Sequence, residues 1–244
     1  MVQQDPFVRW AAAAENARIF RHPAATVVAC AGLAHWDRLV MSGDPDALAA
    51  LVREAIPEVG TTFRPFGPED LVAAVVARVP ELELSARFAW MEITEPVGGQ
   101  VGNGPRWLGE DEWPEVTALL DESFPDSYAR PGQPRVHRWA GVRDSAGRLL
   151  AVAADAWSTD EIGFLAGVTT RPDARGRGLA ATLCTFAADE LLAGRERVAL
   201  LADYSNVAAV ATYRKLGFDL RRVAAARQIS RPDGSRRAAR DAPR

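Results

Sequence analysis

The sequence predicts an α/β protein in which helices cover a mixed β-sheet. Two observations lead to this class. Over residues 105–228, apolar stretches with the period of a strand alternate with stretches that have the period of a helix. The first half of the chain shows a similar alternation. The length of 244 residues allows two domains of about 100–150 residues each.

In the second half, the first expected helix is Glu112–Phe124, which has an apolar stripe along one face. Two further helices, Gly178–Ala193 and Ala208–Leu216, are expected to end at the glycines that follow them, Gly194 and Gly217. The strands expected between these helices are Val136–Val142, Leu149–Trp157, Glu161–Thr169, Arg197–Ala202 and Asp219–Ile229.

In the first half, helices are expected at Asp46–Ala55, with Asp44 or Asp46 as N-cap, and at Pro68–Arg78. The expected strands are Thr26–Leu33, Asp37–Ser42, Thr61–Phe66 and Glu83–Ile93. The resulting order, β-β-α-β-α-β, repeats that of the second half without obvious sequence identity. We therefore expect either a structural duplication or an unrelated α/β substrate domain, and the sequence leaves both open.

Four segments follow from the composition along the chain. Residues 1–96 and 105–228 are expected to form two domains. Residues 97–104 are expected to link them, because the ten residues from Pro96 to Pro105 hold four glycines and two prolines. Residues 229–244 are Arg-rich with almost no large apolar side chain, so we expect a disordered tail.

Charge and composition exclude several classes of function. The formal net charge is −3, and no basic stripe of a nucleic-acid-binding protein is present. No apolar stretch reaches the ~20 residues that span a membrane, and the N-terminus lacks the apolar region of a signal peptide. Cys30 and Cys184 lie far apart, and the three histidines are isolated from one another. We expect a cytoplasmic protein with reduced thiols and no metal, nucleic-acid or membrane partner.

The segment Gly163–Ala180 has the features of an anion site. An apolar strand leads into a loop containing Arg175, Gly176, Arg177 and Gly178, and a helix follows at once. The first turn of a helix leaves about four backbone N–H groups without partners and carries partial positive charge. Glycine lets a phosphate approach the backbone, so this turn suits a pyrophosphate. A tight strand–helix turn with arginines for solubility is the alternative.

A second segment repeats the strand–helix pattern. The strand Arg197–Ala202 is followed by a short polar turn and a helix that contains Tyr213. Asn206 and Tyr213 are seven residues apart, so they lie on one helix face two turns from each other.

Together these two segments resemble the cofactor motifs of the GNAT N-acetyltransferase superfamily. The first family motif, [Q/R]-x-x-G-x-[G/A], is met by Arg175, Gly178 and Ala180. The second, Asn-x-x-Ala followed by Tyr-x-x-x-Gly-Phe, is met by the residues Asn206, Ala209, Tyr213, Gly217 and Phe218. The two motifs occur in the family's order, and the resemblance covers residues 105–228.

The resemblance implies a mostly antiparallel sheet in which two parallel strands, Glu161–Thr169 and Arg197–Ala202, splay apart around acyl-CoA. The repeated element order favours two such domains in tandem, with an unrelated α/β substrate domain as the alternative. A first domain of this kind would lack a cofactor site, because Met41–Asp46 places two acids and a proline where the phosphate loop would lie. The implied cofactor contacts are Val168, Thr169, Thr170, Arg175, Gly176, Arg177, Gly178, Leu179, Ala180 and Asn206.

The implied reaction is direct acyl transfer, most simply of acetyl, from acetyl-CoA to an amine, without a metal. Tyr213 is the implied general acid to the CoA thiolate, because its ordinary pKa of ~10 exceeds the ~8.5 of a thiol. Glu161 is the implied base, although it lies one residue out of register from the family's glutamate. Because of this difference, its neighbour Asp160 is the other candidate for the base. A water chain is the alternative route for the proton, and packing against the sheet is the alternative role for Tyr213.

The resemblance places the acceptor beside the first helix of the second half. Acids crowd this helix and its exit loop together with Tyr128, which favours a cationic amine, although a solvated acidic helix face would look the same. The acids are Glu110, Asp111, Glu112, Glu115, Asp121, Glu122 and Asp126. A non-catalytic acyl-CoA sensor and a homodimer both stay open at this point.

Overall fold

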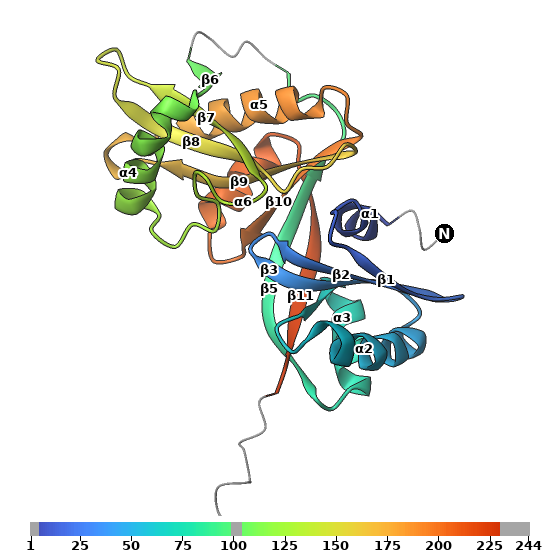
Figure 1. Cartoon of the computed structure of the whole chain (residues 1–244). Helices are drawn as coiled ribbons and strands as arrows, with labels where there is room; N and C mark the ends of the chain where they lie inside the picture. The colour runs from blue at the N-terminus through green and yellow to red at the C-terminus, as the bar shows by residue number, and fades with distance from the viewer. Residues whose placement is uncertain (1–4, 99–103, 230–244) are drawn as a thin grey trace, which may run out of the picture.

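The computed structural model describes residues 5–98 and 104–229, and the strands of this part of the chain form one mixed sheet (Figure 1). Their order across the sheet is β1-β2-β3-β4-β11-β5-β10-β9-β8-β7-β6. Two neighbouring pairs, β3 with β4 and β9 with β10, are parallel, and the other pairs are antiparallel. The mixed, mostly antiparallel sheet is therefore confirmed. The strands are β1 (Arg18–His22), β2 (Ala25–Leu33), β3 (Trp36–Gly43), β4 (Arg64–Pro68), β5 (Leu82–Ile93), β6 (Pro105–Trp107), β7 (Val136–Arg143), β8 (Leu149–Ala156), β9 (Ile162–Thr170), β10 (Arg197–Asp203) and β11 (Asp219–Gln228).

Each element expected from the sequence is present, with its ends displaced by a few residues. The helices are α1 (Pro6–Ala12), α2 (Pro45–Val59), α3 (Glu69–Arg78), α4 (Trp113–Ser123), α5 (Leu179–Leu192) and α6 (Val207–Lys215), with 3-10 turns η2 (Glu110–Glu112) and η3 (Pro172–Ala174). The elements α1, β1 and β6 were not predicted. They span seven, five and three residues, and β1 is exposed at four of its five positions, so none shows a clear period.

With α1 and β1 included, both halves read α-β-β-β-α-β-α-β, and β6 is an extra strand in the second half. This repeat supports the tandem hypothesis, which stays a proposal together with the boundaries at residues 96 and 105. Most of the predicted linker and nearly all of the predicted tail lie outside the described residues.

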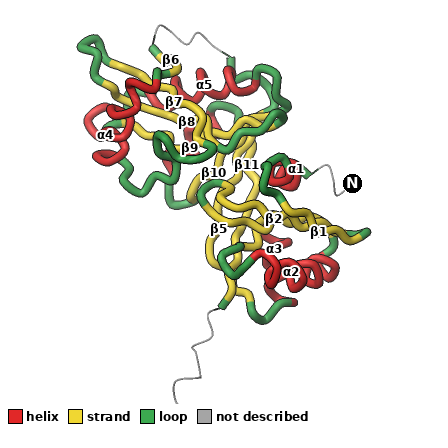
Figure 2. The backbone as a smooth tube through the Cα atoms, viewed as in Figure 1, coloured by secondary structure: helices red, strands yellow, loops and turns green. Residues whose placement is uncertain are grey.

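The two halves exchange their last strands. β5 of the first half pairs with β10 of the second, and β11 of the second half pairs with β4 of the first. At the centre, β5 and β11 pair with each other from Asp219 opposite Glu92 to Gln228 opposite Leu82. Figures 1 and 2 show both strands running from one lobe into the other. Thus β4 of the first half and β10 of the second half each have one neighbouring strand from the other half.

Helices cover both faces of the sheet. On one face, α1 and α4 lie over a single apolar cluster that runs through both halves, including Trp90 of β5 and Phe164 of β9. On the opposite face, α2 and α3 cover the first half, and α5 and α6 cover the second. Successive strand residues point to opposite faces, so Trp90 belongs to the shared cluster and its neighbour Met91 to the core under α5.

Helix α1 connects the halves through Trp10. The carboxylate of Asp5 caps the helix by accepting from the Phe7 amide at 2.9 Å. The indole of Trp10 stacks on Phe164 with 4.7 Å between ring centroids, and its Nε1–H donates to the Trp157 carbonyl at 2.9 Å. A residue of the first ten is thereby buried against strands of the second half.

Because β5 is part of both lobes, we expect the protein to unfold in one cooperative transition. Met91→Ala would leave a cavity beside Leu200 and Leu220, the residues opposite Met91 on β10 and β11. We expect this cavity to lower the free energy of unfolding by about 2–5 kcal/mol. Urea unfolding followed by tryptophan fluorescence and far-UV circular dichroism should give coincident curves.

Val75→Ala, in α3 of the first half, is the matched control and should move the same single transition. Two separate transitions, one moved only by Met91→Ala and the other only by Val75→Ala, would show that the halves unfold independently.

Candidate active site

A cavity lies where β9 and β10 diverge. These strands are paired only from Ile162 opposite Arg197 to Leu165 opposite Leu200, although β9 continues to Thr170. The pairing of β9 with β8 is interrupted by a bulge at the same level. Gly167 lies in this bulge with φ +60°, and a Cβ there would lie 2.8 Å from the Trp139 ring. The splayed parallel pair is confirmed, and close packing against Trp139 requires the glycine.

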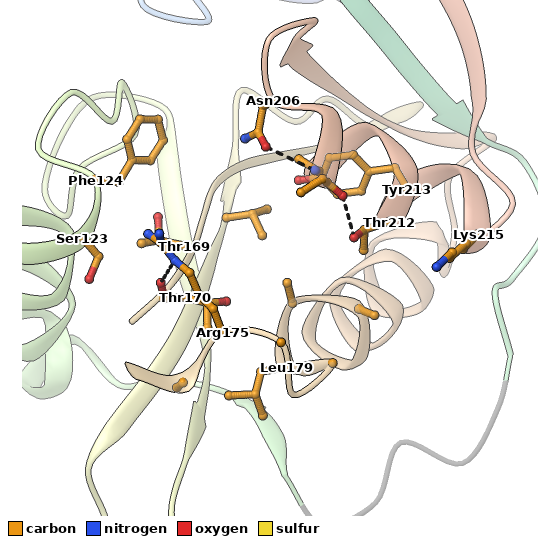
Figure 3. A pocket seen from close by; sticks show the side chains of 18 residues that line it. Ser123, Phe124, Thr169, Thr170, Arg175, Leu179, Asn206, Thr212, Tyr213 and Lys215 are labelled. Carbon is orange, nitrogen blue, oxygen red and sulfur yellow. Dashed lines mark hydrogen bonds between the residues drawn. The ribbon is translucent and has the colours of Figure 1, made fainter. Parts of the chain in front are cut away.

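This space, here called the wedge cavity, has a volume of about 730 Å³ (Figure 3). The end of β9, the start of α5 and one face of α6 form its walls. Most residues predicted to form the site line it: Val168, Thr169, Thr170, Arg175, Gly176, Gly178, Leu179, Ala180, Asn206 and Tyr213. Arg177 and Glu161 do not line it.

The N-terminus of α5 opens into the wedge cavity without a capping side chain. Its N-cap is Gly178 at φ +77°, a conformation that side chains rarely adopt. The corresponding helix of the first half, α2, is closed by Asp44, whose Oδ1 accepts from the Asp46 and Ala47 amides at 3.0 Å each. The first-turn amides of α5 therefore remain available to a ligand, whereas two of those of α2 are occupied.

The two arginines of the loop are oriented differently. Arg175 lines the wedge cavity, and its Nε donates to the Thr170 carbonyl at 3.3 Å (Figure 3). The guanidinium of Arg177 donates to the Asp173 carbonyl at 2.8 Å. Arg177 thus binds η3, and only its backbone belongs to the turn that faces the cavity.

Asn206 and Tyr213 lie on α6, across the wedge cavity from Thr169 and Arg175 (Figure 3). Asn206 is the N-cap, and its Oδ1 accepts from the Ala209 amide at 3.2 Å. The side chain of Tyr213 is nearly buried, at 7% exposure. Burial, with a smaller contribution from the Cys184 thiol, raises the pKa of Tyr213 well above 10. Its hydroxyl therefore stays protonated at neutral pH and is suited to donate.

Glu161 is not brought to this group. It precedes the first residue of β9, whereas the wedge cavity begins at Val168 near the last. Its carboxylate binds Arg9 of α1 at 2.7 Å, and the same guanidinium binds Glu196 at 2.7 Å. Glu161, which is one residue out of register from the family's glutamate, thus forms an ion pair that connects the two halves.

Sequence reasoning missed four polar or aromatic side chains that line the wedge cavity: Ser123, Phe124, Thr212 and Lys215. Thr212 and Lys215 lie within two residues of Tyr213, so their proximity along α6 was an available signal. Lys215 is also the only lysine of the chain. Ser123 and Phe124, at the end of α4, come from a distant segment, but they lie between Glu122 and Asp126, in the stretch that the resemblance places beside the acceptor.

A second cavity of about 430 Å³ adjoins the first, because Phe124 and Asn206 line both. Its walls come from both halves of the chain. The first half contributes Ala34, Arg38 and Phe88, and the second half contributes Trp157 and the stretch Phe164–Gly167, among others. The carboxylates among its lining residues are Asp126 and Asp203.

Most of the acids expected to face the acceptor are paired elsewhere. Glu112 and Glu115 both bind Arg143, at 2.8 and 2.7 Å. Hydrogen bonds from Arg106, from the Gly109 amide and from Arg143 hold the pKa of Glu112 at about 2. Asp121 binds Arg130, and Glu122 binds Arg171. Asp126 and Tyr128 are the members of the predicted set that line the second cavity.

Within residues 5–98 and 104–229, no group of three or more His, Cys, Asp or Glu could hold a metal. Both cysteines are free and buried, and burial raises the pKa of Cys184 to about 12. None of the described helices is long and apolar enough to cross a membrane.

Residues 107–218 match the model of the acetyltransferase (GNAT) family. This part of the chain belongs to the GNAT family. Two mycothiol acetyltransferases, from Mycobacterium sp. strains MCS and JLS, are each 29% identical over 203 residues, which is 73% of this chain and 68% of theirs.

Solved GNAT structures match most of the chain, first half included. An acetyltransferase from Novosphingobium aromaticivorans is 26% identical, with a TM-score of 0.53 over 80% of this chain and 88% of its own. A GCN5-related N-acetyltransferase from Kribbella flavida shares the fold at 18% identity, with a TM-score of 0.63 over 94% and 97%. The family match and the mycothiol acetyltransferases support an acetyl-CoA-dependent N-acetyltransferase.

The ion pairs around Glu112 predict an acid-sensitive contribution to stability. A carboxylate whose pKa is about 2 in the folded state and 4.5 otherwise stabilises the fold fully above pH 4.5. This contribution is lost as the pH falls towards 2. We expect Glu112→Gln to lower the free energy of unfolding by about 1 kcal/mol at pH 7. The change is small because Arg106, which binds Glu112, is half exposed and solvent weakens the ion pair.

Urea unfolding of both proteins between pH 7 and pH 3 tests this expectation, and the difference should shrink with the pH. Glu110→Gln, in the same 3-10 turn, is the control. Glu110 forms no ion pair with a described residue, so its variant should match the wild type throughout.

Proposed function

We propose that the wedge cavity binds acetyl-CoA and that the acetyl group passes directly to an amine that enters through the second cavity. The observation that carries this proposal is the open N-terminus of α5, placed at the end of a splayed parallel strand pair. Amides without partners and a positive helix end favour a pyrophosphate at this position. The equivalent turn of α2, closed by Asp44, lacks this property.

In this proposal each part of the cofactor has a defined partner. The backbone amides from Arg175 to Ala180 hold the pyrophosphate, including those of Gly176 and Arg177. The Arg175 guanidinium and the Lys215 ammonium, which also line the cavity, add positive charge. The backbone of Val168–Thr170 holds the pantetheine and the acetyl carbonyl, and Asn206 holds the pantetheine arm from α6.

The chemistry then needs three events. An unprotonated amine attacks the thioester carbonyl, and a tetrahedral oxyanion forms. A backbone N–H near Val168–Thr170 stabilises the oxyanion. The C–S bond breaks, CoA leaves as a thiolate, and the nitrogen, which became positively charged in the attack, loses one proton to water. Glu161 has no part in these steps, because Arg9 holds it at the far end of β9.

Tyr213 donates to the departing thiolate. Its raised pKa means that full proton transfer to a thiolate of pKa ~8.5 is uphill, so its contribution is a hydrogen bond that stabilises the leaving group. A hydroxyl that is nearly buried makes this bond in surroundings with little competing water.

Titration calorimetry with CoA and acetyl-CoA tests the binding step, and release of free thiol with an amine panel tests the transfer. The panel should hold amino acids, polyamines, aminoglycosides, peptide N-termini and a mycothiol-type amine. Absence of heat with both cofactors would remove the proposal.

Gly178→Glu should abolish acetyl-CoA binding. The new carboxylate would lie against the pyrophosphate, and the left-handed backbone at this position would be strained. Calorimetry should show at least a ~100-fold increase in Kd, equivalent to about 2.8 kcal/mol.

Gly194→Glu is the matched control, because Gly194 follows the opposite end of α5, has φ +83° and has equally open surroundings. It should bind acetyl-CoA normally. Equal loss in both variants would point to strain in α5 instead of a pyrophosphate site.

Tyr213→Phe should lower kcat by a factor of about 10²–10³ with little change in the Kd of acetyl-CoA, because only the leaving thiolate uses this hydrogen bond. Tyr204→Phe is the control. Tyr204 has a buried hydroxyl with no partner among the described residues, and it lines neither cavity. Unchanged kcat in the Tyr213 variant would remove the acid role.

A further inference from the structure

The second cavity contains a buried arginine without a counterion. The side chain of Arg38 lines this cavity, and the residue is only 2% exposed. Its Nε–H donates to the Leu33 carbonyl at 3.3 Å. Among the described residues, no carboxylate lies within ion-pair distance of its guanidinium. Buried charges are normally paired, so this one is incomplete as the protein stands.

The surroundings of Arg38 hold its guanidinium in place without neutralising it. The group lies over the ring of Phe66 at 4.4 Å and near that of Phe88 at 6.0 Å. The charged side chain that most affects its guanidinium is another cation, Arg64. Burial, and then Arg64, lower the pKa of Arg38 to about 9. An anion that entered the cavity would relieve both effects, and the fixed guanidinium would lose little entropy on binding it.

The shape and charge of the cavity narrow the choice of anion. One guanidinium matches one planar carboxylate through two parallel hydrogen bonds. The carboxylates of Asp126 and Asp203 line the same cavity and disfavour a dianionic phosphate. They suit an ammonium group instead, and Asp203 lies only three residues from Asn206, which lines both cavities. The amine of a ligand bound between these groups would therefore lie towards the wedge cavity.

We propose that the acetyl acceptor is an amine that also carries a carboxylate, and that Arg38 of the first half binds this carboxylate at the end of the second cavity away from the acetyl group. This inference rests on the proposed function, because it assigns the acceptor of the same reaction. It gives the first half a role in substrate selection: β3 supplies the residue that recognises the acceptor.

The test compares two series of acceptors with saturating acetyl-CoA. One series is the ω-amino acids from glycine to 6-aminohexanoate, and the other is the corresponding ω-amino amides, which lack the negative charge. The wild type should prefer the carboxylates in kcat/KM by about 30-fold at the best chain length, the usual scale for a buried charge pair. That chain length reports the distance from Arg38 to the transferred group.

Arg38→Gln should reduce this preference to about one, mainly by lowering kcat/KM for the carboxylates. Arg38→Lys, which keeps the charge but not the bidentate geometry, should fall between. The ratio of the two series is measured within each variant, so partial misfolding does not change it. Arg87→Gln is the control, because Arg87 pairs with Glu69 and does not line the cavity. It should keep the wild-type preference.

A wild type without preference, or an Arg38→Gln variant that keeps it, would overturn the proposal. If no member of either series reacts, N-acetylated ω-amino acids are tested with CoA for stabilisation against heat. Stabilisation that needs both the carboxylate and Arg38 supports the proposal, and its absence overturns it. Acetyl-CoA binding is measured separately by calorimetry, so a failure of the proposed function is distinguished from a failure of the acceptor assignment.

Discussion

The wedge between β9 and β10 depends on how β10 is held along its other edge. β10 pairs with β5 from Val198 to Asp203, nearly its whole length, but with β9 only as far as Leu200. Because β5 fixes the position of β10, the bulge at Gly167 separates β9 from β10 and does not shift the whole pair. β5 comes from the first half and is fixed in turn by β11. The cavity of the second half is therefore built on a strand that the first half provides.

The exchange of β5 and β11 gives the first half a structural role, although α2 has no open N-terminus like that of α5. Asp44 caps α2, so this helix lacks the open N-terminus on which the proposed cofactor site of α5 depends. The first half nevertheless supplies the neighbour of β10, packs Trp10 of α1 between the lobes and holds Glu161 through Arg9. The first half also contributes Arg38 to the second cavity.

The ion pairs around α4 have a related consequence for the acceptor. A sequence with seven acids near one helix indicates a negative cleft, but arginines from β6, β7 and neighbouring loops neutralise most of them. The second cavity is lined by Asp126 and Asp203 and also by the buried cation of Arg38. Its polarity is thus that of a site for a zwitterion, which could not be inferred from the acids of α4 alone.

The sequence alone determined the elements and the local motifs, because period, caps and turn glycines act within a few residues. It thus predicted the helix after Gly178, the helix face shared by Asn206 and Tyr213, and an aspartate cap at the start of α2. Short elements such as α1 were missed, since seven residues show too little period. Only the tertiary structure decided the partners of β5 and β11, the distance of Glu161 from the site and the position of Arg38 in the second cavity. These features depend on contacts between residues far apart in the chain, which local periodicity does not encode.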